Sequence, residues 1–295
     1  MTENEFLLED RLGVIRDTIK KYGEENFYLS FSGGKDSTVV HHLLDMAIPD
    51  NKIPRVFSNT GIEYNDIVKF VKELAQQDDR FVMIYPRKNI KEMLEEVGYP
   101  FKSKEHSQRL YEWRHGEKNK EYIKKYLEGG RFGCPSCLLY QFQDGFNLNV
   151  SHRCCQELKK KPFKQYQKEN RKSITITGMM KDEVGQRTTL NCIVTRGDKV
   201  IKFHPLAKVT KEWEDWFVET YKIHLCRLYY PPFNFERTGC KGCPYNLTLQ
   251  RDLSAMEEYG LENEKKQCEY IWQPVYAEYR RIGYRLDNEE QLTLF

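Results

Sequence analysis

The chain has 295 residues, and its 47 basic and 44 acidic side chains give a formal net charge of +3. This length is ample to bury a core, either in one large domain or in a domain with an appendage. The near balance of charge gives no case by itself for a nucleic-acid partner. No run of eighteen apolar residues occurs, and the acidic N-terminus is unlike a signal peptide. We therefore expect a cytoplasmic protein that does not enter a membrane.

Short apolar runs alternate with helical patterns along the chain. A stripe of leucine and isoleucine predicts an amphipathic helix over residues 5–20. Strands are predicted at 27–31, 54–59, 81–85 and 173–177, and further helices after the first of these strands, at 65–77 and at 90–97. This alternation predicts the α/β class, with a doubly wound and mostly parallel sheet covered on both faces. Ligands of such sheets bind beyond the carboxyl ends of the strands.

Three regions follow from these patterns. Residues 1–24 form an N-terminal helix, and residues 25–205 form the α/β domain. This domain carries an insertion at about 99–172, which is rich in charge, poorly periodic and not expected to be part of the sheet. Residues 206–295 are expected to form a helical, cysteine-rich C-terminal extension.

The stretch Leu-Ser-Phe-Ser-Gly-Gly-Lys-Asp-Ser-Thr at residues 29–38 is the most informative in the sequence. A strand that turns through two glycines into a helix gathers backbone N–H groups and the positive end of the helix dipole at one point. Glycine permits backbone angles and a close approach that a Cβ would block. Lys35 adds a mobile positive charge, and we expect Ser37 or Asp36 to cap the helix. These residues predict a site for a phosphorylated ligand.

The spacing of this loop excludes two common phosphate motifs. Neither the Walker pattern nor the dinucleotide fingerprint G-x-G-x-x-G is present. The run Ser-Gly-Gly-Lys-Asp-Ser at 32–37 resembles instead the PP-loop of the ATP pyrophosphatases, which cleave ATP between its α and β phosphates. A glycine turn before an ordinary helix is the alternative, and six matching residues between a strand and a helix disfavour it.

The nine cysteines are the second informative feature, because intracellular proteins seldom use them as disulfides. They include two Cys-x-x-Cys pairs and one adjacent pair: Cys134 with Cys137, Cys240 with Cys243, and Cys154 with Cys155. Two Cys-x-x-Cys turns are typical of a Cys₄ zinc site, whereas one such turn with the adjacent pair suggests an iron–sulfur cluster. We interpret Cys192, Cys226 and Cys268 as buried small apolar side chains.

The chain resembles the phosphoadenosine phosphosulfate reductase family, which belongs to the PP-loop superfamily together with a DNA phosphorothioation pyrophosphatase. Four segments carry the resemblance: 32–37, 57–63, 176–183 with Arg187, and 204–244. The resemblance implies an adenine nucleotide alpha hydrolase-like fold. It also implies a nucleotide site made of Ser32, Gly33, Gly34, Lys35, Asp36, Ser37, Asn59, Thr60, Gly61, Gly178 and Arg187.

The resemblance also suggests a role for the cysteines. Members that bear a cluster carry an adjacent Cys-Cys before a Lys-x-x-Pro run and a later Cys-x-x-Cys, which together hold a [4Fe–4S] cluster. Cys154, Cys155, Cys240 and Cys243 match that pattern, so they are the expected iron–sulfur ligands. Cys134 and Cys137 lie outside it. They are a candidate second site, which could bind zinc, form a redox pair or replace the adjacent cysteines as ligands.

Several departures argue against reduction of an adenylyl sulfate. The reductases use a cysteine in a mobile C-terminal segment, and no cysteine follows Cys268 here. Met180 stands where the family has Arg, Val184 replaces Ser, and Asn59 replaces Asp. An Arg fork suits a phosphosulfate, so its loss disfavours that substrate. The reductase is therefore the second interpretation, and a nucleotide-binding regulatory module without catalysis is another alternative.

The first interpretation is an ATP-dependent, pyrophosphate-releasing sulfur transferase or related modifying enzyme. Lys35 and Lys181 are expected to stabilise charge, and Asp36 to help place Mg²⁺. Sulfur would come from a donor protein such as a cysteine desulfurase, and the acceptor is left open among DNA, RNA and a small molecule. The basic insertion, with Tyr111 and Trp113 interleaved, could follow a nucleic-acid backbone. A solvated charged face is an equally good interpretation.

Overall fold

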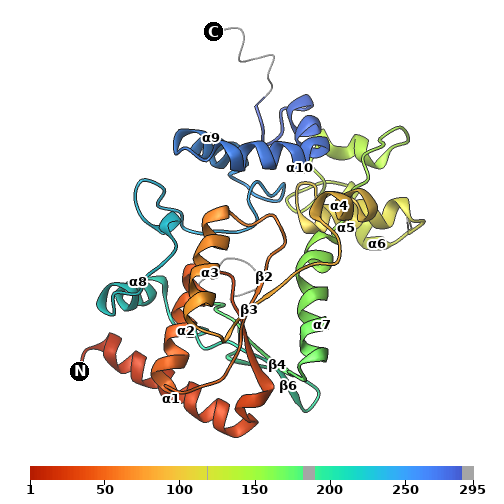
Figure 1. Cartoon of the computed structure of the whole chain (residues 1–295). Helices are drawn as coiled ribbons and strands as arrows, with labels where there is room; N and C mark the ends of the chain where they lie inside the picture. The colour runs from red at the N-terminus through yellow and green to blue at the C-terminus, as the bar shows by residue number, and fades with distance from the viewer. Residues whose placement is uncertain (118, 182–189, 288–295) are drawn as a thin grey trace. The chain divides into compact units, whose positions relative to one another are not determined.

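A computed structural model describes residues 1–117, 119–181 and 190–287 of the chain (Figure 1). The chain divides into two compact units. The first, here called the sheet unit, comprises Met1–Asn59, Glu63–Tyr85 and Lys161–Thr238. The second, called the cysteine unit, comprises Thr60–Ile62, Pro86–Lys160 and Gly239–Phe295. Each unit is described by itself below.

The sheet unit is built on six strands in the order β3-β2-β1-β4-β6-β5. Their bounds are β1 (Phe27–Ser30), β2 (Arg55–Ser58), β3 (Phe81–Ile84), β4 (Ile174–Ile176), β5 (Ile193–Arg196) and β6 (Lys199–Phe203). All neighbours pair in parallel except β5, which is antiparallel to β6. The predicted α/β class with a mostly parallel sheet is confirmed, and the four predicted strands occur as β1 to β4.

Helices lie on both sides of this sheet. The sheet unit contains α1 (Glu3–Tyr22), η1 (Glu24–Asn26), α2 (Lys35–Ala47), α3 (Asn65–Gln77), α7 (Lys161–Glu169), α8 (Lys211–Thr220) and η5 (Arg227–Tyr229). Figure 1 shows α7 on one side of the strands and α1, α2 and α3 on the other. The crossovers between parallel strands therefore cover both faces, as a doubly wound sheet requires.

Alternating side chains of β1 pack against the two helical layers. Tyr28 contacts Val56 of β2 and Tyr166 of α7 in one apolar cluster. Phe31, just after the strand, points the other way and meets the Phe81 ring edge-on at 5.1 Å. This two-fold alternation within a sheet buried on both faces explains why the run from Phe27 to Leu29 is apolar without interruption.

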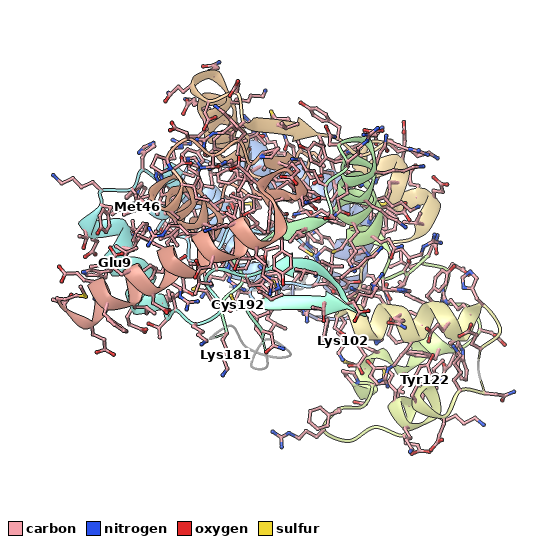
Figure 2. All side chains as sticks on the ribbon, turned by 90° about the horizontal axis from the view of Figure 1, so that it is seen from below. Glu9, Met46, Lys102, Tyr122, Lys181 and Cys192 are labelled. Carbon is pink, nitrogen blue, oxygen red and sulfur yellow. The ribbon has the colours of Figure 1, made fainter. Side chains whose placement is uncertain are left out.

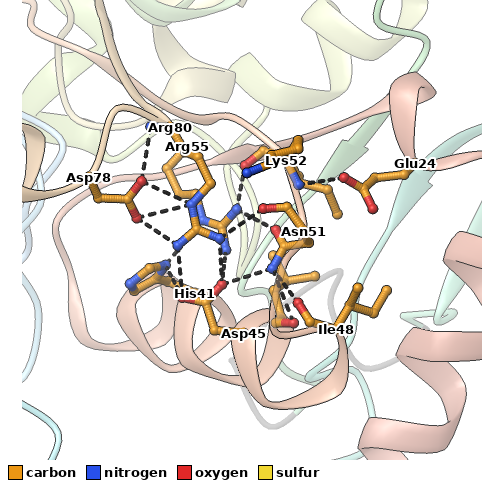
Figure 3. Close-up of polar contacts among 11 residues, drawn as sticks. Glu24, His41, Asp45, Ile48, Asn51, Lys52, Arg55, Asp78 and Arg80 are labelled. Carbon is orange, nitrogen blue, oxygen red and sulfur yellow. Dashed lines mark hydrogen bonds and ion pairs between the residues drawn. The ribbon is translucent and has the colours of Figure 1, made fainter.

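A buried network of charged groups lies where β2 begins, next to α2 (Figure 3). The guanidinium of Arg55 is fully buried and donates to Asp45 over 2.6 Å and to the ring nitrogen Nδ1 of His41 over 3.1 Å. Arg80 donates to both Asp45 and Asp78. Buried charges are tolerated when they are paired and hydrogen-bonded, and this network satisfies that condition.

The cysteine unit is helical. It contains α4 (Ile90–Val97), α5 (Lys104–Arg114), α6 (Glu121–Leu127), η2 (Ser136–Phe142), η3 (Gln156–Lys160), α9 (Leu249–Glu258) and α10 (Glu262–Arg281). Among its described residues, the β-pairing of this unit is a single isolated bridge between Tyr99 and Val150. No helix in the described part of the chain is long and apolar enough to span a bilayer.

Candidate functional site

The glycine loop joins β1 to α2 in the sheet unit. Gly33 has a φ of +72°, and a Cβ at this position would lie 2.8 Å from Cγ2 of Ile67 on α3. An L side chain would therefore be both strained and too close to its neighbour. Gly34 has an ordinary φ of −82° and is the N-cap of α2.

Hydrogen bonds within the loop hold it closed. The N–H of Ser32 donates to the Ser37 hydroxyl over 3.2 Å, and the N–H of Gly34 donates to the Ser32 hydroxyl, also over 3.2 Å. The Ser37 hydroxyl in turn donates to the carbonyl of Gly34 over 3.0 Å. The expectation that Ser37 or Asp36 caps α2 is wrong, because the cap is Gly34 and no side chain accepts there.

Two hydroxyls from a distant part of the sheet unit lie against the loop. The backbone N–H of Lys35 donates to the hydroxyl of Tyr229 over 3.1 Å. That hydroxyl is also 2.9 Å from Oγ1 of Thr238. Sequence reasoning did not assign either residue to the site, although both fall within the last of the segments that resemble the reductase family.

The Lys35 amine lies between two carboxylates at the start of α8. Its Nζ is 2.6 Å from Asp215 and 3.2 Å from Glu214. Glu214 is fully buried, and burial, followed by the nearby Asp36, raises its pKa to about 8. Both acidic residues raise the pKa of Lys35 against the opposing effect of burial. Neither carboxylate was anticipated, because only the packing of α8 against α2 brings them to the loop.

The other predicted nucleotide residues are placed as follows. Gly178, after β4, approaches the first turn of α2 so closely that a Cβ would lie 2.8 Å from the Asp36 carbonyl. Asn59 follows β2, at the same edge of the sheet as the loop. Thr60 and Gly61 belong to the cysteine unit. Lys181 is exposed, and Figure 2 shows its side chain pointing outward. Arg187 lies outside the described residues.

Four thiols gather in the cysteine unit. Hydrogen bonding to Cys155 and burial raise the pKa of Cys154, and the thiolates of Cys240 and Cys243 raise it further. The Cys154 thiol lowers the pKa of Cys155 to about 6, helped by the lysine side chains at 159, 104 and 160. The N–H of Cys243 donates to the carbonyl of Cys240 over 3.3 Å, which closes the Cys-x-x-Cys turn. The four predicted ligands therefore lie within electrostatic reach of one another.

The structure does not bring these thiols together as a site for a single metal ion. In the described part of the chain, no group of three or more His, Cys, Asp or Glu side chains converges on one point that could hold a metal ion. Burial raises the pKa of the Tyr245 hydroxyl, and the nearby thiols of Cys154, Cys155 and Cys243 raise it further, whereas a hydrogen bond to Ser107 lowers it.

The remaining cysteines occupy separate environments. Cys134 is buried and hydrogen-bonded to Tyr126 beside Lys102, and burial raises its pKa to about 11, whereas Cys137 is exposed. Cys226 and Cys268 are buried, as expected, and Cys192 is half-buried. A Cβ on Gly242 would lie 2.7 Å from the sulfur of Cys268, so this thiol is packed against the turn that carries Cys243.

Some aromatic and basic residues of the insertion make contacts within the cysteine unit. The Trp113 indole donates to the carbonyl of Phe142 over 2.8 Å, and Arg114 donates to the carbonyl of Leu148 over 2.8 Å. Tyr111 stacks on His115 with ring centroids 3.9 Å apart. These contacts give Tyr111, Trp113 and Arg114 partners within the cysteine unit.

A family model described as the phosphoadenosine phosphosulfate reductase domain matches residues 26–132 and 138–246. An uncharacterized protein of Methanocaldococcus jannaschii is 38% identical over 118 residues, which are 37% of this chain and 26% of that protein. The chain thus matches about a quarter of the length of this curated relative.

Two solved structures are similar at 12% identity. The crystal structure of phosphoadenylyl-sulfate reductase from Candida auris in a phosphate complex has a TM-score of 0.49, covering 81% of this chain and 96% of that chain. The ammonia-dependent NAD synthetase from Campylobacter jejuni has a TM-score of 0.42, covering 93% and 95%.

Proposed function

Since the chain belongs to the phosphoadenosine phosphosulfate reductase domain family, we propose that it is an enzyme that activates its substrate with ATP, releases pyrophosphate and transfers sulfur. The observation that carries the proposal is the loop at 32–37, where the start of α2 meets the Lys35 amine. Helix N-termini of this kind bind phosphate through backbone N–H groups and the helix dipole.

The chemistry assigned to the loop is attack on the α-phosphate of ATP. A substrate oxygen forms a bond to this phosphorus, the bond to the β-phosphate oxygen breaks, and pyrophosphate leaves. A sulfur nucleophile then displaces AMP from the adenylated substrate. The loop residues hold the β and γ phosphates, Lys35 stabilises their charge, and Asp36 is suited to a Mg²⁺ ion that neutralises the triphosphate.

The roles of Lys181 and Arg187 remain part of the proposal. Lys181 is exposed, and its amine is proposed to contact the bound triphosphate. Asn59 and Gly178 are proposed to line the nucleoside side of the site. Gly178 has the strongest support, since its close approach to the first turn of α2 requires the absence of a side chain.

We assign a [4Fe–4S] cluster to Cys154, Cys155, Cys240 and Cys243, with zinc as the alternative. Thiolates are the ligands that such clusters use, and the lysine side chains near Cys155 favour the ionised form of its thiol. When bound, the cluster would supply a place to hold the sulfur that is transferred. A donor protein such as a cysteine desulfurase would deliver that sulfur, and the acceptor is a nucleic acid or a small molecule.

Two measurements test this proposal. Purified protein should release pyrophosphate from ATP in the presence of Mg²⁺ and acceptor, which a regulatory module without catalysis would not do. Protein prepared without oxygen should contain iron and acid-labile sulfide in equal amounts, which separates a cluster from zinc in one assay. Absence of ATP binding by the folded wild-type protein would overturn the assignment of the loop.

A further inference from the structure

The segment that carries Tyr229 is firmly anchored within the sheet unit. Its neighbours Cys226 and Leu228 are buried. Arg227 pairs with Asp66 at the start of α3 through two hydrogen bonds, of 2.7 and 2.9 Å. Because the residues that precede Tyr229 are fixed, its hydroxyl is held in place rather than resting on the loop by chance.

The hydroxyl lies where an anion is expected. It accepts from the N–H of Lys35, the first residue of α2. An added Cβ on Gly34 would be 3.1 Å from this hydroxyl and 3.6 Å from that of Thr238. N–H groups in the first turn of a helix have no partner within the helix and are the donors that bind phosphate oxygens. One of these donors is therefore already occupied.

We propose that the Tyr229 hydroxyl stands in for a phosphate oxygen and is displaced from the Lys35 N–H when nucleotide binds. Thr238 holds the hydroxyl in this position through their 2.9 Å contact. The inference rests on the proposed function and adds a residue that sets the affinity of the site. Tyr229 competes with the ligand for the N–H of Lys35.

This competition predicts the direction in which ATP affinity changes when the Tyr229 hydroxyl is removed. Binding of nucleotide to the wild-type chain exchanges the tyrosine hydrogen bond for one to phosphate, whereas Tyr229→Phe removes the competitor before binding. A net hydrogen bond in a protein corresponds to roughly a three- to tenfold change in an equilibrium constant. The Phe variant should therefore bind Mg·ATP about three- to tenfold more tightly. Without nucleotide it should unfold at a lower temperature, since the Lys35 N–H loses its acceptor.

The experiment measures Mg·ATP affinity by titration calorimetry and the unfolding temperature with and without ATP. Thr238→Val is the second variant, and it should shift both quantities in the same direction by a smaller amount. Tyr230→Phe is the matched control. Its hydroxyl contacts the Leu225 N–H at 3.2 Å instead of the loop, so its ATP affinity should equal that of the wild type.

Failure of this inference can be told apart from failure of the proposed function. A wild-type chain that binds no ATP contradicts the proposed function. A wild-type chain that binds ATP while Tyr229→Phe binds it equally or more weakly overturns the inference alone, because the hydroxyl then either stays in place or contacts the bound nucleotide. An equal gain in ATP affinity in the control variant Tyr230→Phe would also overturn the inference.

Discussion

The Nε–H of Arg55 donates to Nδ1 of His41 over 3.1 Å inside the sheet unit. This ring nitrogen is therefore the acceptor and carries no proton. Burial and then the positive charge of Arg55 lower the pKa of His41 to about 3, although Asp45 opposes them. His42 and Arg80 lower the pKa of His41 further. A neutral histidine is thus built into the network that joins α2 to β2.

The stability of the protein should fall as the pH drops below about 6.5, the value for an unfolded histidine. Between that pH and about 3, the unfolded state binds a proton that folded His41 does not, so the free energy of unfolding decreases. Urea unfolding at pH 7 and pH 5 should show a loss on the order of 2 kcal/mol from this residue. His41→Gln keeps a hydrogen-bond acceptor for Arg55. Between pH 7 and pH 5 its free energy of unfolding should therefore fall by about 2 kcal/mol less than that of the wild type. Equal losses of stability in the wild type and in His41→Gln would contradict the assignment of a neutral, buried His41.

Lys35 should have separable structural and binding roles. Lys35→Met leaves the buried Glu214 carboxyl, which its raised pKa keeps largely protonated at pH 7, without its polar partner. The substitution should lower the free energy of unfolding by about 1–3 kcal/mol, besides weakening ATP binding at least tenfold. Adding Glu214→Leu replaces the unsatisfied carboxyl by an apolar side chain, so the double variant should recover stability without recovering ATP affinity. Chemical unfolding and calorimetry on the three proteins test this, and recovery of both properties together would show that Lys35 acts only through folding.

The two loop glycines should respond differently to substitution. Gly33→Ala combines a positive φ with a contact of 2.8 Å to Ile67, so it should cost about 1–2 kcal/mol of stability or more. Gly34→Val has an allowed φ and should leave the chain folded, but its side chain fills the space that phosphate needs and should abolish ATP binding. Thermal unfolding and ATP titration separate the two effects. Unchanged ATP affinity in folded Gly34→Val would exclude the loop as the phosphate site.

The cluster ligands can be tested by colour and iron content. Anaerobically purified protein should be brown with about four irons per chain, and Ser at Cys154, Cys155, Cys240 or Cys243 should bleach it, since hydroxyls hold iron poorly. Cys134→Ser is the matched control and should keep the colour. Colour lost at Cys134 and Cys137 but kept at Cys154 and Cys155 would falsify the ligand set. Stoichiometric zinc without iron would favour a Cys₄ site made of the two Cys-x-x-Cys turns.

The protein should not reduce adenylyl sulfate or its 3′-phosphorylated form with thioredoxin as the electron donor. Such a reaction needs an accessible thiolate, and burial keeps the thiol of Cys268 inaccessible and raises its pKa to about 12. A sulfite assay with wild-type protein and Cys268→Ser tests this. Robust sulfite production that the substitution abolishes would make reduction the preferred function.

Local sequence determined the loop and the elements around it. The glycine turn between β1 and α2 was recognisable because its requirements, an apolar strand, two residues without a Cβ and a helix start, are all satisfied within about twenty residues. The apolar periodicity of α1, α3 and α4 also matched their bounds closely. The hairpin of β5 and β6 was missed, because charged and hydroxyl residues interrupt its short apolar stretches and Phe203 is its only buried residue.

Only the tertiary structure decided which groups meet the loop. Glu214, Asp215, Tyr229 and Thr238 lie roughly 180 to 200 positions beyond Lys35 in the sequence, and no local pattern distinguishes them from other acidic or hydroxyl residues. Packing of α8 on α2, and the fixed segment around Tyr229, bring them to Lys35. The gathering of the four thiols has the same origin, because sequence spacing predicts that two cysteines share a turn, while long-range packing decides which turns meet.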